Sequence, residues 1–103
     1  MIRHIVALRY AASTPARDRQ AILADLSALR GHLKGILDFQ PFRNISAEDP
    51  LVHGFRDGFW FDFTDEAARD AYLADAAHQA VGARIIAACI GGAAGVHVID
   101  IAL

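Results

Sequence analysis

The first residues of the chain alternate between two sets of side chains, which is the period of a β-strand. One side would carry Ile2, His4, Val6, Leu8 and Tyr10, and the other Arg3, Ile5, Ala7 and Arg9. We therefore predict a first strand over residues 3–10. A second strand is predicted over residues 36–45, where Pro41 lacks a backbone donor and so favours an edge position or a bulge.

A helical period follows the first strand. Pro15 suits the first position of a helix, because its missing N–H would have no partner there, and Ser13 or Thr14 can cap that helix. Apolar residues then recur at spacings of three and four: Ile22, Leu23, Leu26, Leu29 and Leu33. This stripe predicts an amphipathic helix that ends at Gly31 or Gly35.

The most aromatic segment, residues 59–63, predicts a third strand with two apolar faces, because Trp60 faces away from Phe59, Phe61 and Phe63. One helical layer covers only one face of a sheet, so the other face would need a second subunit. An alternative stays open in which Asp57-Gly58 forms a hairpin turn and shortens this strand. The polar connection before it, residues 44–54, is expected to be the most mobile part.

Two helices and a strand are predicted in the last third. Thr64 and Asp65 can cap a short helix to about Leu73, and Asp75 can cap a longer helix that Gly91-Gly92 ends. Residues 96–103 are almost all apolar, which is typical of an inner strand covered on both sides. The order β-α-β-β-α-α-β predicts a ferredoxin-like α+β fold, with a four-stranded antiparallel sheet and its helices on one face.

Length and composition limit the class of protein. The chain has 103 residues, of which 54% are hydrophobic, and this predicts a single domain over residues 1–103. Its net charge of −2 and scattered Lys and Arg argue against nucleic acid as a partner. No apolar run is long enough for a membrane span or a signal peptide, so we expect a cytoplasmic protein without a membrane partner. The single cysteine, Cys89, is expected to be a small buried hydrophobe.

The best candidate chemistry lies where the last two helices meet. If Asp75 caps the longer helix, His78 is its third residue, and Val81, Ile85 and Cys89 follow on the same inward face. An inward imidazole, with the phenol of Tyr72 on the preceding helix, is either a satisfied core group or the polar end of a pocket.

The pocket interpretation gives these residues roles. A neutral His78 could remove a proton from an acidic carbon or phenol, while Tyr72 donates a hydrogen bond to the oxyanion that forms. His4 and Tyr10 share a strand face that could line the pocket, with Val81 and Ile85 as apolar wall. In the alternative, His78 bonds a backbone carbonyl and Tyr72 only fills space.

Metal and cofactor chemistry are not expected. His4, His78, His97 and Asp100 do not have the spacing of a ligand set, and no close pair of His, Cys or Asp supports one. His32 and His53 fall in loop contexts and are expected to be solvated.

A series of short segments occurs in an order that resembles the stress-responsive α/β-barrel (Dabb) family over nearly the full length. They are Ile2-Arg3-His4-Ile5-Val6, Gly35-Ile36, Asn44-Ile45-Ser46, Gly54-Phe55, Phe63 with Asp65-Glu66-Ala67, Ala71-Tyr72-Leu73, Ala77-His78-Gln79-Ala80 and Val96-x-Val98-x-Asp100. The resemblance implies a homodimer in which two four-stranded sheets face each other as an α+β barrel with helices outside. It also implies that His78 and Tyr72 match the working pair of a plant polyketide-cyclising enzyme without metal or organic cofactor, and that His4 matches a pocket histidine.

Three classes of function therefore stay open. The chain could bind a small hydrophobic or aromatic molecule, act as a cofactor-independent lyase or cyclase through Tyr72 and His78, or form a purely structural stress-response dimer. The first two require an open pocket that contains both residues, and the enzyme also requires proton-transfer geometry. The third predicts that side chains fill the space.

Overall fold

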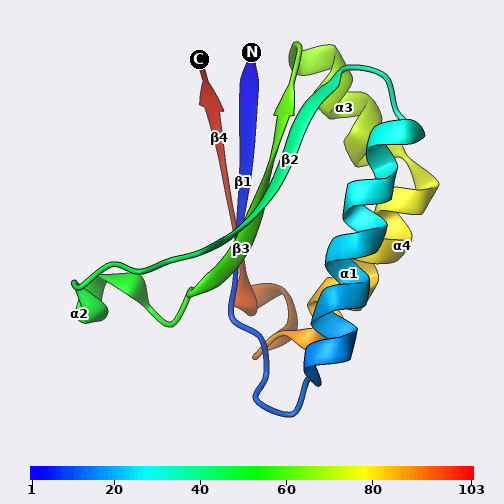
Figure 1. Cartoon of the computed structure of the whole chain (residues 1–103). Coiled ribbons are helices and arrows are strands. Elements are labelled where there is room, and N and C mark those ends of the chain that lie inside the picture. The colour runs from blue at the N-terminus through cyan, green and yellow to red at the C-terminus, as the bar shows by residue number, and fades with distance from the viewer.

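The computed structural model describes residues 1–103 and has one sheet with helices packed against one side (Figure 1). Its elements are β1 (Ile2–Leu8), α1 (Ala16–Ala28), the 3-10 turn η1 (Leu29–Gly31), β2 (Ile36–Arg43), α2 (Asp49–Val52), β3 (Asp57–Phe63), α3 (Glu66–Ala74), α4 (Ala76–Ala88), the 3-10 turn η2 (Gly92–Gly95) and β4 (Val96–Ala102). The predicted order of strands and main helices is confirmed. None of these helices combines the length and the apolar character of a membrane span.

The four strands are antiparallel and lie in the order β2-β3-β1-β4. Pro41 is therefore on an edge strand, as predicted, and β2 also has a register shift between Ile36 and Asp38. The prediction that the last strand is an inner one was wrong, because β4 is the other edge. Although β4 is almost entirely apolar, it has only one neighbouring strand, and most of its residues are exposed.

The alternative with a turn at Asp57-Gly58 was also wrong, because both residues belong to β3, where Asp57 pairs with Leu8. The chain turns earlier, at His53 and Gly54, whose φ angles are 55° and 78°. Gly58 is needed inside the strand, since a Cβ there would lie 2.3 Å from Cζ of Phe42 and 2.5 Å from the carbonyl oxygen of Val6.

The core lies between the sheet and the helices α1, α3 and α4. Its buried residues come from the alternate positions of the central strands and from the predicted helical stripes: Ile2, Val6, Leu8, Ile22, Leu26, Leu29, Phe39, Phe59, Phe61, Phe63, Tyr72, Val81, Ile85 and Cys89. Burying one such large side chain contributes about 1.5–3 kcal/mol. The predicted stripes and the buried Cys89 are thus confirmed.

The opposite face of the sheet carries an ion pair and stacked rings. Nε and Nη2 of Arg3 donate to the buried carboxylate of Asp62 at 2.9 and 3.0 Å, which compensates the burial of that charge. The Arg3 guanidinium also lies 4.8 Å from the ring centroid of Trp60, which stacks on Phe42. The expected bare aromatic face is therefore partly covered by Arg3.

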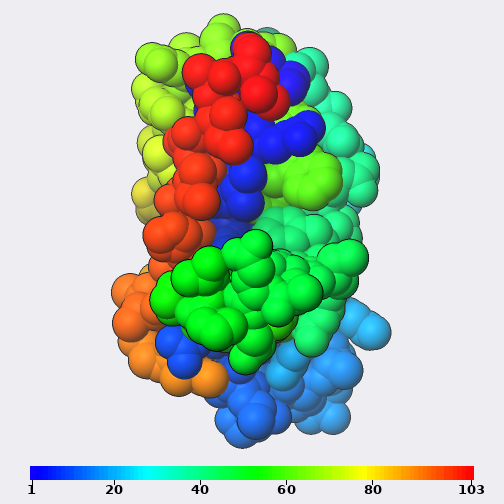
Figure 2. Space-filling model, turned by 90° about the vertical axis from the view of Figure 1, so that its left-hand side faces the viewer, coloured from blue at the N-terminus to red at the C-terminus, as the bar shows by residue number.

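Residues 44–56, which we call the α2 segment, project from the same face and lie over part of it (Figures 1 and 2). Arg56 ties the segment together by donating to the carbonyl oxygens of Asn44 and Ser46 at 3.1 and 2.8 Å and to Asp49 at 2.8 Å. High mobility here stays a prediction, and these bonds argue against it. Ile45 and Leu51 are exposed at the surface of the segment.

Candidate functional site

A cavity of about 270 Å³ lies between helices α3 and α4 and the strands β1 and β4. Its lining combines an apolar wall with a few polar groups: His4, Val6, Phe59, Tyr72, Leu73, His78, Gly82, Ile85, Ile86, Val96, Val98 and Asp100. Three of the predicted site residues, His4, Tyr72 and His78, are thus brought together in one cavity. The space expected to be filled in a purely structural protein is open.

Asp75 places Tyr72 and His78 against each other. Its backbone N–H donates to the carbonyl oxygen of Tyr72 at 3.2 Å and so ends α3, while its carboxylate accepts from the backbone N–H of His78 at 3.0 Å and begins α4. The chain turns sharply between the two helices as a result. The rings of Tyr72 and His78 lie 3.8 Å apart, centroid to centroid, with 34° between their planes.

Asp75 is held from a third side by His32. Nε2 of His32 lies 2.8 Å from the second carboxylate oxygen of Asp75, which joins the end of η1 to the junction of α3 and α4. The His32 side chain is 54% exposed, as predicted for a solvated histidine, yet it has a specific partner. The backbone N–H of His78 and the His32 ring together hold the pKa of the Asp75 carboxyl below its ordinary value.

Tyr72 is buried in a cluster of rings. The centroids of Phe61, Phe63 and His4 lie 4.9, 5.1 and 5.5 Å from its own centroid. Burial raises the pKa of the Tyr72 phenol far above its ordinary value, and no neighbouring charge opposes this shift. The hydroxyl therefore keeps its proton at neutral pH and is available as a hydrogen-bond donor.

His4 is oriented by a carboxylate on the neighbouring strand. The register of β1 and β4 places it opposite Asp100, and its Nδ1 lies 2.6 Å from one carboxylate oxygen. The other oxygen accepts from Nη1 of Arg69 at 3.1 Å. Because an ionised carboxylate only accepts, Nδ1 carries the proton, and in neutral His4 the second ring nitrogen, Nε2, is an acceptor.

His78 has a buried ring nitrogen, Nδ1, that forms no hydrogen bond within the chain. The backbone carbonyl groups of Tyr72 and Leu73 lie close enough to the His78 ring to favour the charged imidazolium. Neither of them is oriented to accept a hydrogen bond from Nδ1. Burial lowers the pKa of His78, the nearby His4 lowers it further, and Asp75 opposes both. The imidazole is therefore neutral at neutral pH, with unused hydrogen-bonding capacity.

Not all predicted ligand-binding residues belong to this cavity. Ile85 lines it, whereas Val81 is buried in the core and is not among the lining residues. Tyr10 is a correction, because β1 ends at Leu8 and the chain leaves the sheet there. Tyr10 instead bridges to Cys89, packs under Arg19 at 4.7 Å and lines a separate cavity of about 80 Å³.

Sequence reasoning missed Asp100 and Arg69 as parts of the site. The sequence places Asp100 in a set with His4, His78 and His97 that lacks metal-ligand spacing, and in a segment typical of the family, but not in contact with His4. His97 pairs with Ala7 and lies on the open face of the sheet, away from the other three. Only the strand register brings Asp100 to His4, and only the packing of α3 brings Arg69 to Asp100. The alternation of Val96, Val98 and Asp100 on one side of the last strand was the available signal.

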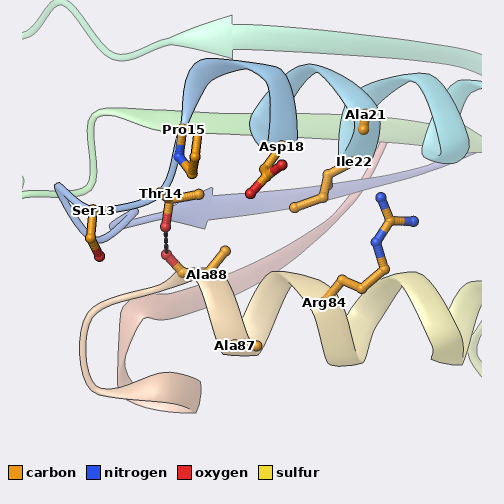
Figure 3. A pocket seen from close by; sticks show the side chains of 9 residues that line it. All are labelled: Ser13, Thr14, Pro15, Asp18, Ala21, Ile22, Arg84, Ala87 and Ala88. Atoms are coloured by element: carbon orange, nitrogen blue, oxygen red, sulfur yellow. Dashed lines mark hydrogen bonds between the residues drawn. The ribbon is translucent and has the colours of Figure 1, made fainter.

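Two larger hollows lie elsewhere in the molecule. One, of about 370 Å³, lies between the start of α1 and the end of α4 (Figure 3). There Thr14 donates to the carbonyl oxygen of Ala88 at 2.9 Å, and Arg84 pairs with Asp25. The other, of about 410 Å³, lies between the α2 segment and the open sheet face, and its lining includes His53, His97 and Ile99.

Comparisons with known proteins agree with this fold. The family model described as "Stress responsive A/B Barrel Domain" matches residues 2–101. A dimeric ferredoxin-like protein of unknown function from Jannaschia sp. CCS1 is 30% identical, with 99% of this chain and 98% of that chain covered and a TM-score of 0.89. A dabb family protein from Mesorhizobium loti is 23% identical, with 99% and 95% covered and a TM-score of 0.75.

An enzyme also shares the fold. The hydroxynitrile lyase from Passiflora edulis is 16% identical, with 99% of this chain and 92% of that chain covered and a TM-score of 0.82. Identity this low shows a common fold and no more. The comparison with curated proteins finds no match.

The electrostatics of the cavity can be measured at His78. Replacing His4 by Gln removes one of the two causes that lower the pKa of His78, so we expect this pKa to rise in the variant. An NMR titration of the imidazole C–H signals measures it. In the wild type, His78 should titrate below the ordinary histidine pKa of about 6.5. Because the folded state favours neutral His78, the stability of the fold is highest above the ordinary histidine pKa of about 6.5. Part of it is lost as the pH falls through the lowered pKa of His78, because the buried ring must then become charged. A wild-type His78 that titrates at or above the ordinary value would contradict the burial assigned to it.

Proposed function

The chain belongs to the stress-responsive A/B barrel domain family, and we propose that it binds a small, mainly apolar molecule in the cavity between α3, α4 and the sheet. The observation that carries this proposal is an open, mostly apolar cavity in which the rings of His78 and Tyr72 lie together, 3.8 Å apart from centroid to centroid. A ligand with one polar group at its end would hydrogen-bond with these two side chains, while its apolar part would lie along the apolar wall.

The charges around the cavity favour a neutral ligand. No Lys or Arg is among the lining residues, and the one carboxylate, Asp100, is already bonded to His4 and Arg69. Tyr72 keeps its proton and His78 is neutral. A carboxylate or phosphate ligand would lose its water without gaining a cation, which is costly in an apolar site. An aromatic alcohol, aldehyde or ketone fits this set of groups better.

The second candidate function is that of a cofactor-independent lyase or cyclase, and the specific observation that favours it is the arrangement of His78 over the Tyr72 ring. A neutral His78 would accept a proton from a C–H or O–H group of the substrate. The electron pair left behind would become an oxyanion, and the Tyr72 hydroxyl would donate to it. The His4–Asp100 pair would supply a second base, because the carboxylate stabilises an imidazolium.

We also infer that the chain forms a homodimer through the open sheet face. Ile99 and Leu51, which border the hollow under the α2 segment, are 46% and 68% exposed. Exposed apolar surface of this kind marks an interaction site. The protein from Jannaschia that is 30% identical over nearly the whole chain is described as dimeric. A second copy related by a two-fold axis would cover the same residues on both chains.

Binding can be tested with 2-naphthol, a neutral bicyclic aromatic whose fluorescence differs between its protonated and deprotonated forms. We expect the wild type to bind it, and His78→Ala and Tyr72→Phe each to weaken binding about three- to tenfold, the value of one hydrogen bond. The matched control is Tyr10→Phe, which removes a hydroxyl from the separate cavity and should leave binding unchanged. Equal losses in the Tyr10 and Tyr72 variants, or stability losses with no binding effect at Tyr72 and His78, would overturn the proposal.

The dimer can be tested by sedimentation at micromolar concentration. Ile99→Asp places a charge on the open face and should dissociate or unfold the chain, since two such charges would be buried at the interface. Ile90→Asp is the control, because Ile90 is 48% exposed but follows α4 outside the sheet. A wild type that sediments only as an 11.1 kDa species would show that the inferred dimer does not form.

A further inference from the structure

Gly82 occupies the middle of α4, a position where glycine destabilises a helix relative to alanine. Glycine is usually required where φ is positive or where another chain segment approaches closely. Gly82 meets neither condition, because its φ is not among the positive ones and a Cβ built on it would meet no atom within 4 Å. A Cβ on Gly35, by contrast, would lie 2.6 Å from Cβ of Ala68. The fold itself therefore does not require a glycine at position 82.

Gly82 is part of the cavity wall, and the empty space next to it belongs to the cavity. Gly82 follows His78 by one helical turn and precedes Ile86 by another, so the three residues share one stripe of α4. All three line the cavity described above. A side chain at position 82 would project into the cavity next to the His78 ring.

Elsewhere in α4 the small residue is alanine. Five alanines lie at exposed positions of this helix: Ala76, Ala77, Ala80, Ala83 and Ala87. If position 82 needed only a small residue, alanine would meet that need and strengthen the helix. The absence of a methyl group at position 82 therefore keeps the adjacent part of the cavity open.

We propose that Gly82 is a specificity-determining residue: its missing side chain leaves a recess beside His78 that accepts the wide apolar part of a ligand, a fused or substituted aromatic ring. This inference rests on the proposed binding function and names the class of ligand. The polar end of such a molecule meets His78 and Tyr72, while its ring system lies against α4 at Gly82. A narrower, single-ring molecule has less need of the recess.

The test uses 2-naphthol as the bicyclic probe and phenol as the single-ring probe. Gly82→Leu should weaken the binding of 2-naphthol tenfold or more and affect phenol less. Ala83→Leu is the matched control, because Ala83 is the next residue of the same helix and is exposed to solvent. Equal affinity of the wild type and Gly82→Leu for 2-naphthol would overturn the inference while leaving the binding function in place. A wild type that binds neither probe would instead overturn the proposed function, and the role of Gly82 with it.

A second measurement needs no ligand. Gly82→Ala should raise the melting temperature by roughly 2–8 °C, from the usual helix preference for alanine in a chain of this size. A lower melting temperature would show that the fold requires glycine here, and would overturn the inference whatever the binding data show.

Discussion

The candidate site depends on Asp75, which joins three elements at one point through its carboxylate and its backbone N–H. It begins α4 by accepting from the backbone N–H of His78, it bonds His32 at the end of η1, and its own backbone N–H closes α3 on Tyr72. A side chain that caps a helix normally stabilises only that helix. Here the same bonds fix the distance between a phenol and an imidazole from two different helices.

The central strand β1 divides the chemistry of the molecule between its two faces. On the helix side His4 bonds Asp100 and lines the cavity, and on the open side Arg3 bonds Asp62 and lies over the ring of Trp60. Consecutive residues of a strand point to opposite faces, so this division is fixed by the alternation itself. The proposed ligand and the proposed second copy of the chain would therefore occupy different faces of the sheet, and covering the open face would leave the cavity unobstructed on the other.

The sequence allowed prediction of whatever depends on short-range spacing. The helical stripes, the edge position of Pro41 and the inward position of His78 follow from periods of two and 3.6 residues and from one capping residue. The placement of Tyr72 across from His78 rested on the resemblance to the family. Strand order is a property of the whole chain, and for this reason an apolar edge strand was mistaken for an inner one. The same limit hid the pair of His4 and Asp100, which are 96 positions apart. Tyr10 was misplaced because the alternation of side chains continues past Leu8, where β1 ends, and Tyr10 bridges to Cys89 at the end of α4 instead of pairing within the sheet.

The central claim is that the cavity containing His78 is where a ligand binds, and the five histidines of the chain provide its most direct test. His4 and His78 line this cavity, His53 and His97 line the hollow on the open face, and His32 is outside both. Ring-nitrogen NMR spectra recorded with and without 2-naphthol report on all five at once. The account predicts that the signals of His78 and His4 shift on addition of 2-naphthol while those of the other three stay in place. Shifts at His53 and His97 alone, with His78 and His4 unchanged, would contradict it.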